Sequence, residues 1–322
     1  MAVYTKISKS ELENFLSDYD LGELERFEGI TQGVSNTNYH VFTNKNRYVL
    51  TIFEPHRIIE KDLPFFFNFS GFLAQKGIKC PQASKDRKGN IVKSLQGRPA
   101  TLIDYLEGRD IGVKNLTPDH CKKMGSFLAR MHKVSSGFDQ SRENSMGFKF
   151  FPHLCQKVED RVDEFENGLK IILQEELAFL QENWPEKLPS GVVHADAFPD
   201  NVFFNDGDLS AIIDFYFSCT DFYAFDLAIA VNAWCFDENN TFVPERFSSF
   251  IEAYIKERPL SEAEKKAFRV LCRGAAFRIL ASRLEEYFMY DPNTMEMVPH
   301  DPAAYLKRLH FHQQEDVLNE LA

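Results

Sequence analysis

The chain has 322 residues, 44% of them hydrophobic, and a formal net charge of -11. This length favours two lobes with a sizeable core, and the acidic balance argues against nucleic acid or an anionic membrane as the main partner. The six cysteines form neither a C-x-x-C motif nor a disulfide framework, so we expect reduced, half-buried side chains. With no apolar leader and no long apolar run, the sequence indicates a soluble cytoplasmic protein.

The first third of the chain predicts a small antiparallel sheet with an inserted helix. A capping box that begins at Ser8 starts a short helix. A second helix is expected over 60–76, where Gly77 ends it. Strand-like runs separated by turn signals lie at 24–30, 37–43, 47–53, 90–95 and 99–105.

The remainder of the chain predicts a larger, mainly helical part. Thr117-Pro118 is a helix start, a further helix is expected near 156–180, and the pattern from about 222 onward is helical, with a second capping box at Ser261. The fold class is therefore α+β. We expect an N-lobe over 1–106 and a C-lobe over 107–322, joined by a short connection.

One stretch, GVVHADAFPDNVFFNDGDLSAIIDFYF at 191–217, places many carboxylates beside apolar strands. Its Asp206-Gly207 turn predicts a hairpin, and antiparallel pairing would bring Asn201 and Asp214 to the same open end. Their oxygens suit Mg²⁺ that completes its shell with phosphate. Asp196 is then left to accept a proton from a hydroxyl, and His194 is expected to hydrogen-bond locally and hold the loop.

The order H-x-D-x-x-x-x-N, followed by an Asp after a hairpin, matches the kinase catalytic loop and its metal-binding Asp. A polar hairpin with turn aspartates would explain Asp206 and Asp208, but not carboxylates that flank apolar strands. A zinc hydrolase would need a second His pair at ligand spacing, which the sequence lacks. The sequence therefore predicts an ATP- and Mg²⁺-dependent phosphotransferase with a two-lobed, protein-kinase-like fold.

A kinase also needs a loop that covers the nucleotide phosphates. The segment after the first strand is placed for this, since Gly33 permits close backbone approach, and Ser35 and Asn36 offer hydrogen-bond donors. The end of the last N-lobe strand is the expected hinge. There the backbone groups of Asp104 and Leu106 would pair with adenine.

Two positions depart from the kinase pattern. Thr51 stands on the third strand where kinases carry a Lys that holds the α and β phosphates, and Tyr216 stands where kinases carry Gly after D-F. Arg57 or Lys61 could replace the missing cation, and a solvated surface role is the alternative for either. The departure at Thr51 also keeps open a pseudokinase that binds nucleotide without turnover.

The segments HADAFPDN, IIDFYF and TDFYAFDLAIAVNAWCF resemble the aminoglycoside-phosphotransferase-like kinases, and within that group the type II homoserine kinases. The runs MAVYT, TIFEPHRIIEKDLPFF and RGAAFRILASRL extend the resemblance over nearly the whole chain. It implies transfer of the ATP γ-phosphoryl group to the side-chain hydroxyl of L-homoserine, in threonine biosynthesis. Asp196 would be the base, and Asn201 and Asp214 would hold Mg²⁺.

Homoserine is a zwitterion, so its site needs an anion and a cation. Asp200 and Asp221 are candidates for the ammonium, and Arg278 and Arg283 for the carboxylate; ordinary ion pairs are the alternative for each. Asp226 resembles the family Asp that braces the catalytic loop, with a helix N-cap as an equally good interpretation. A kinase of another hydroxylated metabolite, such as an aminoglycoside or choline, stays open, and the sequence leaves the oligomeric state undetermined.

Overall fold

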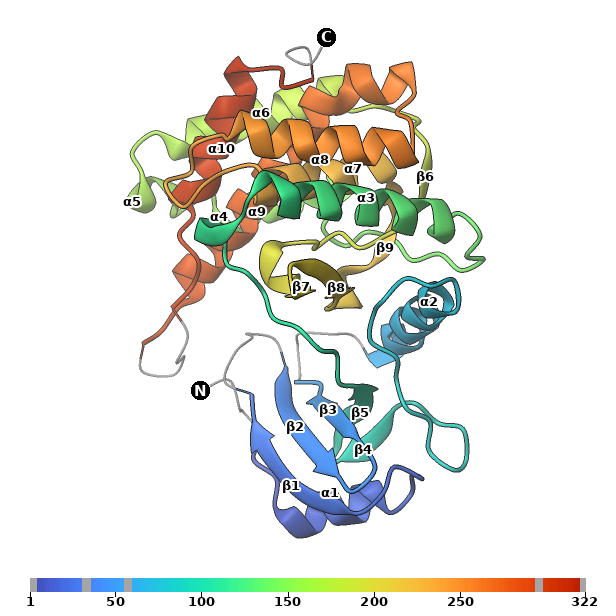
Figure 1. Ribbon diagram of the computed structural model, residues 1–322. Coiled ribbons are helices and arrows are strands. Elements are labelled where there is room, and N and C mark those ends of the chain that lie inside the picture. Colours follow the sequence, from blue (N-terminus) through green and yellow to red (C-terminus); the bar gives the residue numbers. More distant parts are fainter. Residues whose placement is uncertain (1–4, 31–35, 55–59, 293–297, 319–322) are drawn as a thin grey trace. The chain divides into compact units, whose positions relative to one another are not determined.

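The computed structural model describes residues 5–30, 36–54, 60–292 and 298–318, which form two compact units (Figure 1). The first unit comprises the chain up to Glu107, together with Ala211–Tyr216 and Pro292. The second comprises Gly108–Ser210, Phe217–Asp291 and the described residues from Val298 onward. The sequence did not predict that Ala211–Tyr216 belongs with the first unit.

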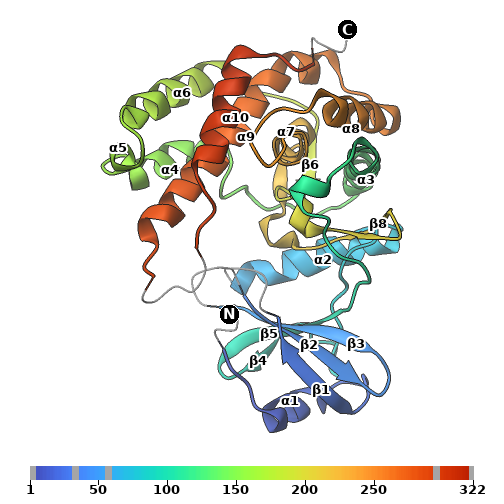
Figure 2. The same cartoon turned by 60° about the vertical axis from the view of Figure 1, so that its left-hand side comes forward.

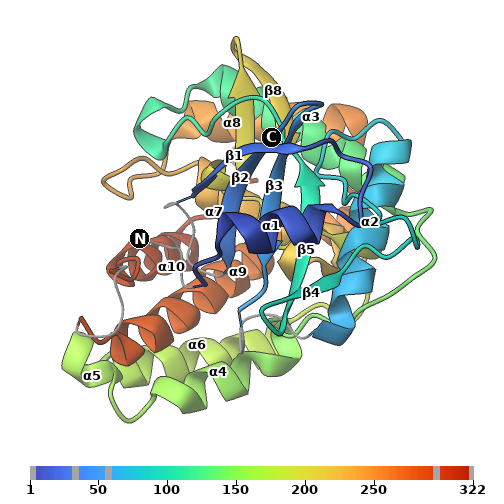
Figure 3. The ribbon, with the colours of Figure 1, turned by 90° about the horizontal axis from the view of Figure 1, so that it is seen from below.

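The first unit is built on a five-stranded antiparallel sheet with strand order β1-β2-β3-β5-β4. The predicted capping box at Ser8 is present and begins helix α1 (Lys9–Leu16). Figure 3 shows α1 lying across the strands, where its apolar side chains Leu12, Phe15 and Leu16 join the core of the sheet. The strands are β1 (Leu24–Gly29), β2 (Thr37–Thr43), β3 (Arg47–Ile52), β4 (Lys93–Leu95) and β5 (Arg98–Asp104).

The inserted helix α2 (Leu63–Gln75) follows a short 3₁₀ turn, Glu60–Asp62. Together they fill the range predicted for one helix. The helix is rich in phenylalanine, and its buried rings contact the returning segment Ala211–Tyr216: the ring centroids of Phe69 and Phe215 are 5.9 Å apart. This returning segment is therefore part of the apolar core of the first unit.

The second unit is a helical assembly around α7, which is buried along its whole length. Helix α7 packs on α9, α9 packs on α10, and α3 packs on α8 (Figure 2). None of the helices within the described ranges is long and apolar enough to cross a membrane. The helices are α3 (Pro118–Ser135), α4 (Phe151–Val158), α5 (Val162–Phe165), α6 (Leu169–Asn183), α7 (Tyr223–Trp234), α8 (Pro244–Glu257), α9 (Glu262–Met289) and α10 (Ala303–Gln314).

The single helix predicted near 156–180 is wrong. The chain instead forms α4, the one-turn α5 and α6, and the break before α6 lies at Gly168, whose φ is +84°. A left-handed residue interrupts a right-handed helix, and glycine adopts that conformation without steric cost. Pro152 in the first turn of α4 marks a helix start that the sequence reading also missed.

Two short strand pairs carry the stretch 191–217. Strand β6 (Ser190–Val193) pairs antiparallel with β9 (Cys219–Phe222), and β7 (Val202–Asn205) pairs with β8 (Asp208–Ile212). The predicted hairpin turn between β7 and β8 is confirmed, with φ of +50° at Asp206 and +81° at Gly207. Positive φ at both central residues is the signature of the tight turn that matches strand twist.

All six cysteines are free and buried, more deeply than the half-buried state expected. Burial raises the pKa of Cys80, Cys121 and Cys155 to about 12 each. Because the thiolate is the reactive form of cysteine, these side chains act as small apolar residues of the core.

Candidate active site

The loop that follows β6 is held in an unusual backbone conformation at Ala195. Its φ is +61°, a left-handed conformation that costs roughly 1–2 kcal/mol for a residue with a Cβ. Both of its backbone groups are bound by buried charged side chains: its N–H donates to Asp226 Oδ1 at 2.7 Å, and its C=O accepts from Arg278 Nη1 at 2.8 Å. These two bonds fix the residue that precedes Asp196.

Asp226 is the centre of a fully buried hydrogen-bond network. Besides Ala195, its carboxylate accepts from the backbone N–H of His194 at 3.3 Å and contacts His132 Nε2 at 2.9 Å. The Nδ1 atom of His132 in turn lies 2.7 Å from the Tyr254 hydroxyl. The network shows that Asp226 braces the loop and is not a helix cap, since the N-cap of α7 is Phe222.

The ionisation of this network follows from burial and its hydrogen bonds. Burial alone would raise the pKa of Asp226, but hydrogen bonds from His132 and the backbone outweigh it and hold the pKa below its ordinary value. Burial lowers the pKa of His132, which is therefore neutral near pH 7. Because a carboxylate only accepts, Nε2 of His132 carries the proton and its Nδ1 accepts from Tyr254.

Asp196 and Asn201 are brought into direct contact. The Asn201 amide nitrogen donates to Asp196 Oδ2 at 3.0 Å and to the Asp196 carbonyl at 2.9 Å. The backbone N–H of Asp196 donates to His194 Nδ1 at 3.2 Å, which is the local bond predicted for His194. Since Asn201 uses its nitrogen on Asp196, its amide oxygen is left as an acceptor, which is the atom that a metal ion needs.

The loop is also tied to α7 by Trp234, whose indole Nε1 donates to the Ala197 carbonyl at 2.8 Å. The sequence reading assigned Trp234 to the core, where it is fully buried, but missed this bond. It also missed His132 and Tyr254. No local motif marks these residues, because their roles arise only when α3, α7 and α8 pack together.

Asp214 belongs to the first unit, where it follows β8 with a φ of +64°. Aspartate tolerates this left-handed conformation better than most residues with a Cβ. Two residues later, the ring centroid of Tyr216 lies 5.3 Å from that of Phe53, which directly follows β3. Thr51 is 3% exposed, and its Oγ1 donates to Asn38 Oδ1 at 2.8 Å. The third-strand position that carries Lys in kinases is therefore a buried, hydrogen-bonded hydroxyl.

The predicted ATP contacts that the structure describes lie at the ends of strands β2 and β5 of the first unit. Gly33, Ser35 and the candidate cation Arg57 lie outside the described residues, and Lys61 is exposed. Asn36 is buried, and its Oδ1 accepts from the backbone N–H of Glu54 at 3.4 Å.

At the expected hinge, Asp104 ends β5 and Leu106 follows it. The backbone N–H of Asp104 donates to the Gln82 carbonyl at 2.9 Å, so only its carbonyl is left for adenine. Burial also raises the pKa of the Asp104 carboxyl. The pairing of this segment with adenine stays a prediction.

The candidate substrate residues occupy different surroundings. Asp200 is exposed. Asp221 accepts from Asn144 Nδ2 at 2.6 Å, yet burial raises its pKa. Arg278 is 1% exposed and bound to Ala195, which gives it a structural role in the loop. Arg283 Nη1 donates to the Asp301 carbonyl at 3.1 Å.

A polar cluster that the sequence reading missed surrounds Tyr305 on α10. The guanidinium groups of Arg283 and Arg308 lie 4.6 and 4.4 Å from the centre of its ring. Its fully buried hydroxyl makes only a contact to Arg308 that lacks hydrogen-bond geometry. Burial raises the pKa of Tyr305, and the charge of Asp196 acts in the same direction. Within the described chain, neither arginine is paired with a carboxylate.

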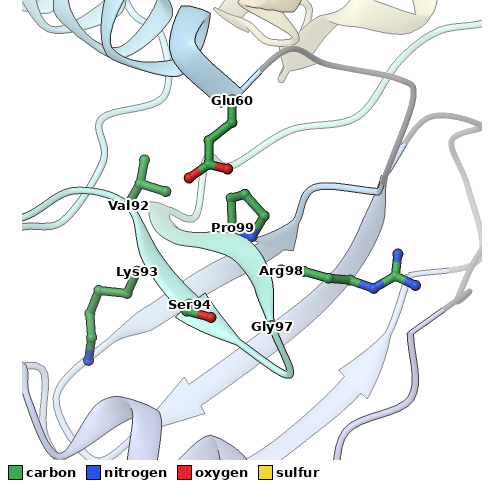
Figure 4. A pocket seen from close by; sticks show the side chains of 7 residues that line it. All are labelled: Glu60, Val92, Lys93, Ser94, Gly97, Arg98 and Pro99. Atoms are coloured by element: carbon green, nitrogen blue, oxygen red, sulfur yellow. The ribbon is translucent and has the colours of Figure 1, made fainter.

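A shallow pocket on β4 and β5 of the first unit does not belong to this site. Figure 4 shows the side chains of Lys93 and Arg98 extending to opposite sides of it. Both charges are already compensated, Lys93 by Asp18 and Arg98 by Glu54. Both cations of this pocket are therefore already paired with carboxylates.

Residues 26–260 match the model of the phosphotransferase enzyme family. The chain belongs to this family. Two similar proteins are the homoserine kinase of Afipia carboxidovorans, 43% identical over 97% of this chain and 95% of its own, and that of Xanthobacter autotrophicus, 42% identical over 98% and 97%. Both likenesses extend over nearly the full length of each protein.

Solved structures of other kinases share the fold. An amicoumacin kinase in complex with AMP-PNP and Ca²⁺ covers 98% of both chains with a TM-score of 0.70 at 15% identity. A microcompartment-associated aminopropanol kinase has a TM-score of 0.68 at 16% identity, over 95% of this chain and 94% of its own. These likenesses confirm the predicted kinase-like fold class.

Proposed function

We propose that this protein is a homoserine kinase, which transfers the γ-phosphoryl group of ATP to the side-chain hydroxyl of L-homoserine. The observation that carries the proposal is the contact between Asp196 and Asn201 on a braced loop. This contact occurs in a chain that is 43% identical to a homoserine kinase over nearly the full length of both proteins. We propose that the enzyme serves threonine biosynthesis and that it is located in the cytoplasm.

Asp196 is the proposed general base. The hydroxyl oxygen of the acceptor attacks the γ-phosphorus, the bond to the β–γ bridging oxygen breaks, ADP leaves, and the hydroxyl proton passes to Asp196. Asn201 holds the carboxylate of Asp196 through one oxygen, at 3.0 Å. This bond fixes the orientation of the carboxylate that receives the proton. His194 positions the backbone of the base and takes no proton.

Asn201 and Asp214 are the proposed Mg²⁺ ligands. Strand β7 begins directly after Asn201 and β8 ends two residues before Asp214, so the hairpin favours their convergence. Amide and carboxylate oxygens suit Mg²⁺, which keeps waters and phosphate oxygens and needs few protein ligands. The ion would neutralise charge on the transferred phosphate.

The nucleotide and acceptor contacts complete the proposal. Gly33, Ser35 and Asn36 would cover the phosphates, and the backbone of Asp104 and Leu106 would bind adenine. For the acceptor ammonium we propose Asp221, with Asp200 as the exposed second candidate. For the carboxylate we propose the half-buried Arg283, a cation without a carboxylate partner in the described chain, together with the neutral hydroxyl of Tyr305 as a hydrogen-bond donor, and Arg278 is the alternative.

Steady-state kinetics with MgATP and an acceptor panel tests the function. We expect the highest kcat/KM for L-homoserine, ahead of L-serine, choline and kanamycin. A higher value for choline or kanamycin would reject the acceptor assignment, and ATP turnover that no acceptor stimulates would indicate a pseudokinase.

A further substrate isolates the carboxylate site. 3-Aminopropan-1-ol is homoserine without its carboxylate, so it should lose roughly 100-fold or more in kcat/KM if a buried cation is left unpaired. Equal turnover of the two would remove Arg283 and Tyr305 from this role.

A further inference from the structure

Asp221, the proposed ligand of the acceptor ammonium, lies on β9, which pairs with the strand β6 that leads into the loop of Asp196. Both oxygens of its carboxylate accept hydrogen bonds: Oδ1 from the backbone N–H of Phe222 at 2.7 Å, and Oδ2 from Asn144 Nδ2 at 2.6 Å. An ionised carboxylate has about four acceptor positions. Asp221 therefore keeps the capacity to accept from a further donor, such as an ammonium group.

The direction of the bond from Asn144 is fixed by its own surroundings. Its Oδ1 accepts from the backbone N–H of Met146 at 2.9 Å, so the amide nitrogen is the atom that meets Asp221. The side chain is enclosed: Asn144 is 9% exposed, and a Cβ on Gly147 would lie 3.0 Å from its amide. Asn144 therefore donates to Asp221, and the carboxylate accepts.

The segment 142–147, which carries this asparagine, is held at both of its ends. The backbone N–H of Thr220 on β9 donates to the Arg142 carbonyl at 2.7 Å, and the N–H of Arg142 donates back to Thr220 Oγ1 at 3.2 Å. At the other end, Met146 Sδ lies 3.9 Å from Nη2 of Arg278, the residue that binds the loop before the proposed base. The segment therefore connects the strand of the proposed ammonium ligand with the arginine that fixes the catalytic loop.

Burial acts against the negative charge that an ammonium ligand needs. It raises the pKa of Asp221, whereas the hydrogen bonds from Asn144 and from the backbone lower it. Of the charged groups nearby, Arg278 on α9 lowers this pKa and Asp226 on α7 raises it. The surrounding elements also carry the Cys219 thiol, which is neutral because burial raises its pKa, Arg142, and the surface ion pair of Glu143 and Lys149. Without the bond from Asn144, burial would be less opposed and Asp221 would take up a proton at a higher pH.

We propose that Asn144 is a positioning residue that acts through Asp221 to select acceptors carrying an ammonium group. Its amide orients one carboxylate oxygen, and a hydrogen bond to an ionised group is stronger than one between neutral groups. The inference rests on the proposed function, because it takes Asp221 as the ammonium ligand. No local motif marks Asn144, which lies 77 positions before its partner in the chain.

Two acceptors test this role: L-homoserine, and 4-hydroxybutanoate, which is homoserine without its ammonium group. In the wild type, kcat/KM should be roughly 100-fold or more higher for homoserine, because the other acceptor leaves a buried charge unpaired. Asn144→Leu keeps the size of the side chain but removes the donor. It should lower kcat/KM for homoserine about 10- to 100-fold, mainly through KM, the range that one hydrogen bond to a charged group supports. The value for 4-hydroxybutanoate should change less than about 2-fold, and the ratio of the two should fall at a higher pH than in the wild type.

Thr220→Val is the matched control. It removes the bond between Thr220 Oγ1 and the backbone of Arg142, and it leaves the bond between Asn144 and Asp221 in place. This variant should keep the wild-type ratio of the two kcat/KM values. If it changes the ratio as far as Asn144→Leu does, loosening of the segment 142–147 is the cause and the proposal is overturned. Thermal melts verify that each variant is folded, and Asn144→Ala, with the same expected result, replaces an Asn144→Leu protein that does not fold.

Asp221→Asn separates this inference from the proposed function. It should reduce the ratio at least as far as Asn144→Leu does, and the double variant should reduce it no further, since both changes act on one interaction. If Asp221→Asn keeps the wild-type ratio, the ammonium role of Asp221 fails and this part of the proposed function must be revised. If Asp221→Asn lowers the ratio while Asn144→Leu does not, only the positioning role of Asn144 is lost. A wild-type protein that does not phosphorylate homoserine would reject the proposed function itself.

Discussion

Arg278 on α9 donates to the carbonyl of Ala195 at 2.8 Å, one residue before the proposed base Asp196. On the other side, the Ala195 N–H is taken by Asp226. A helix more than eighty positions further along the chain thus sets the backbone of the loop. This bond gives Arg278 a role in the loop that does not depend on a ligand.

Replacing Arg278 by lysine separates a positioning role from a substrate role. Arg278→Lys keeps the charge but lacks the planar fork, so the bond to Ala195 is lost. We expect a lower kcat with a nearly unchanged KM for homoserine, and a loss of about 1.5–3 kcal/mol in stability, typical of a hydrogen bond to a charged group. Steady-state kinetics measures kcat and KM, and urea unfolding measures the loss of stability. A raised KM with normal kcat and stability would instead assign Arg278 to the acceptor carboxylate.

Replacing Asp196 tests the base directly. Asp196→Asn should lower kcat by a factor on the order of 10²–10⁴, the usual contribution of a general base, while calorimetry still detects nucleotide binding. Asp208→Asn in the hairpin turn is a suitable control, because this exposed carboxylate pairs only with Lys123 among the described residues. Near-normal turnover in a folded Asp196→Asn protein would remove Asp196 from the role.

How far the sequence predicts the site depends on how local each signal is. Asp196 and Asn201 share one short motif, and a capping box or a turn such as Asp206-Gly207 acts within a few residues. The capping box at Ser8 and the turn at Asp206-Gly207 match the structure. The helix predicted near 156–180 is interrupted at Gly168, because a single glycine in a sequence does not show whether it ends a helix.

The missed features depend on tertiary packing. His132 reaches Asp226 only because α3 packs near α7, and Tyr305 meets two arginines from two helices. Thr51 and Tyr216 were each recognised as departures from the kinase pattern. Nothing in the sequence shows that Tyr216 packs against Phe66 and Phe67 of α2, because these residues lie far apart in the chain.

His312 makes the stability of the second unit sensitive to mild acid. It is fully buried, and neither ring nitrogen has a hydrogen-bond partner among the described residues. Burial lowers its pKa to about 3, below the unfolded value near 6.5. Between these values the unfolded chain binds a proton that the folded chain does not, so stability is full above 6.5 and falls as pH decreases. From pH 7.5 to 5 the loss is about 2 kcal/mol.

Urea unfolding at the two pH values checks this. His312→Leu should show a smaller loss between pH 7.5 and 5 than the wild type, whatever its stability at pH 7.5. His153→Leu, at an exposed position on α4, controls for the loss of a histidine. An unchanged pH dependence in His312→Leu would contradict the assignment.

Replacing two glycines within helices by alanine should change the stability of the protein in opposite directions. A Cβ on Gly125 of α3 would lie 2.1 Å from the backbone oxygen of Phe250 on α8, whereas one on Gly71 of α2 would meet nothing within 4 Å. Gly125→Ala should therefore destabilise by about 1–3 kcal/mol through overpacking, and Gly71→Ala should stabilise by about 0.5–1 kcal/mol. Urea midpoints decide it, and a stable Gly125→Ala protein would contradict the close packing of α3 on α8.

The buried cysteines allow local unfolding of each unit to be measured by thiol labelling. Cys80 belongs to the first unit and the other five belong to the second, and all six are inaccessible while the fold is intact. A thiol reagent can therefore label a side chain only after the part of the chain around it opens. Mass spectrometry that separates the Cys80 peptide from the others would time the opening of each unit in the wild-type protein. If MgATP slows the labelling of Cys80 but not of the other five cysteines, the nucleotide stabilises the first unit alone. If MgATP slows the labelling of all six, it stabilises both units.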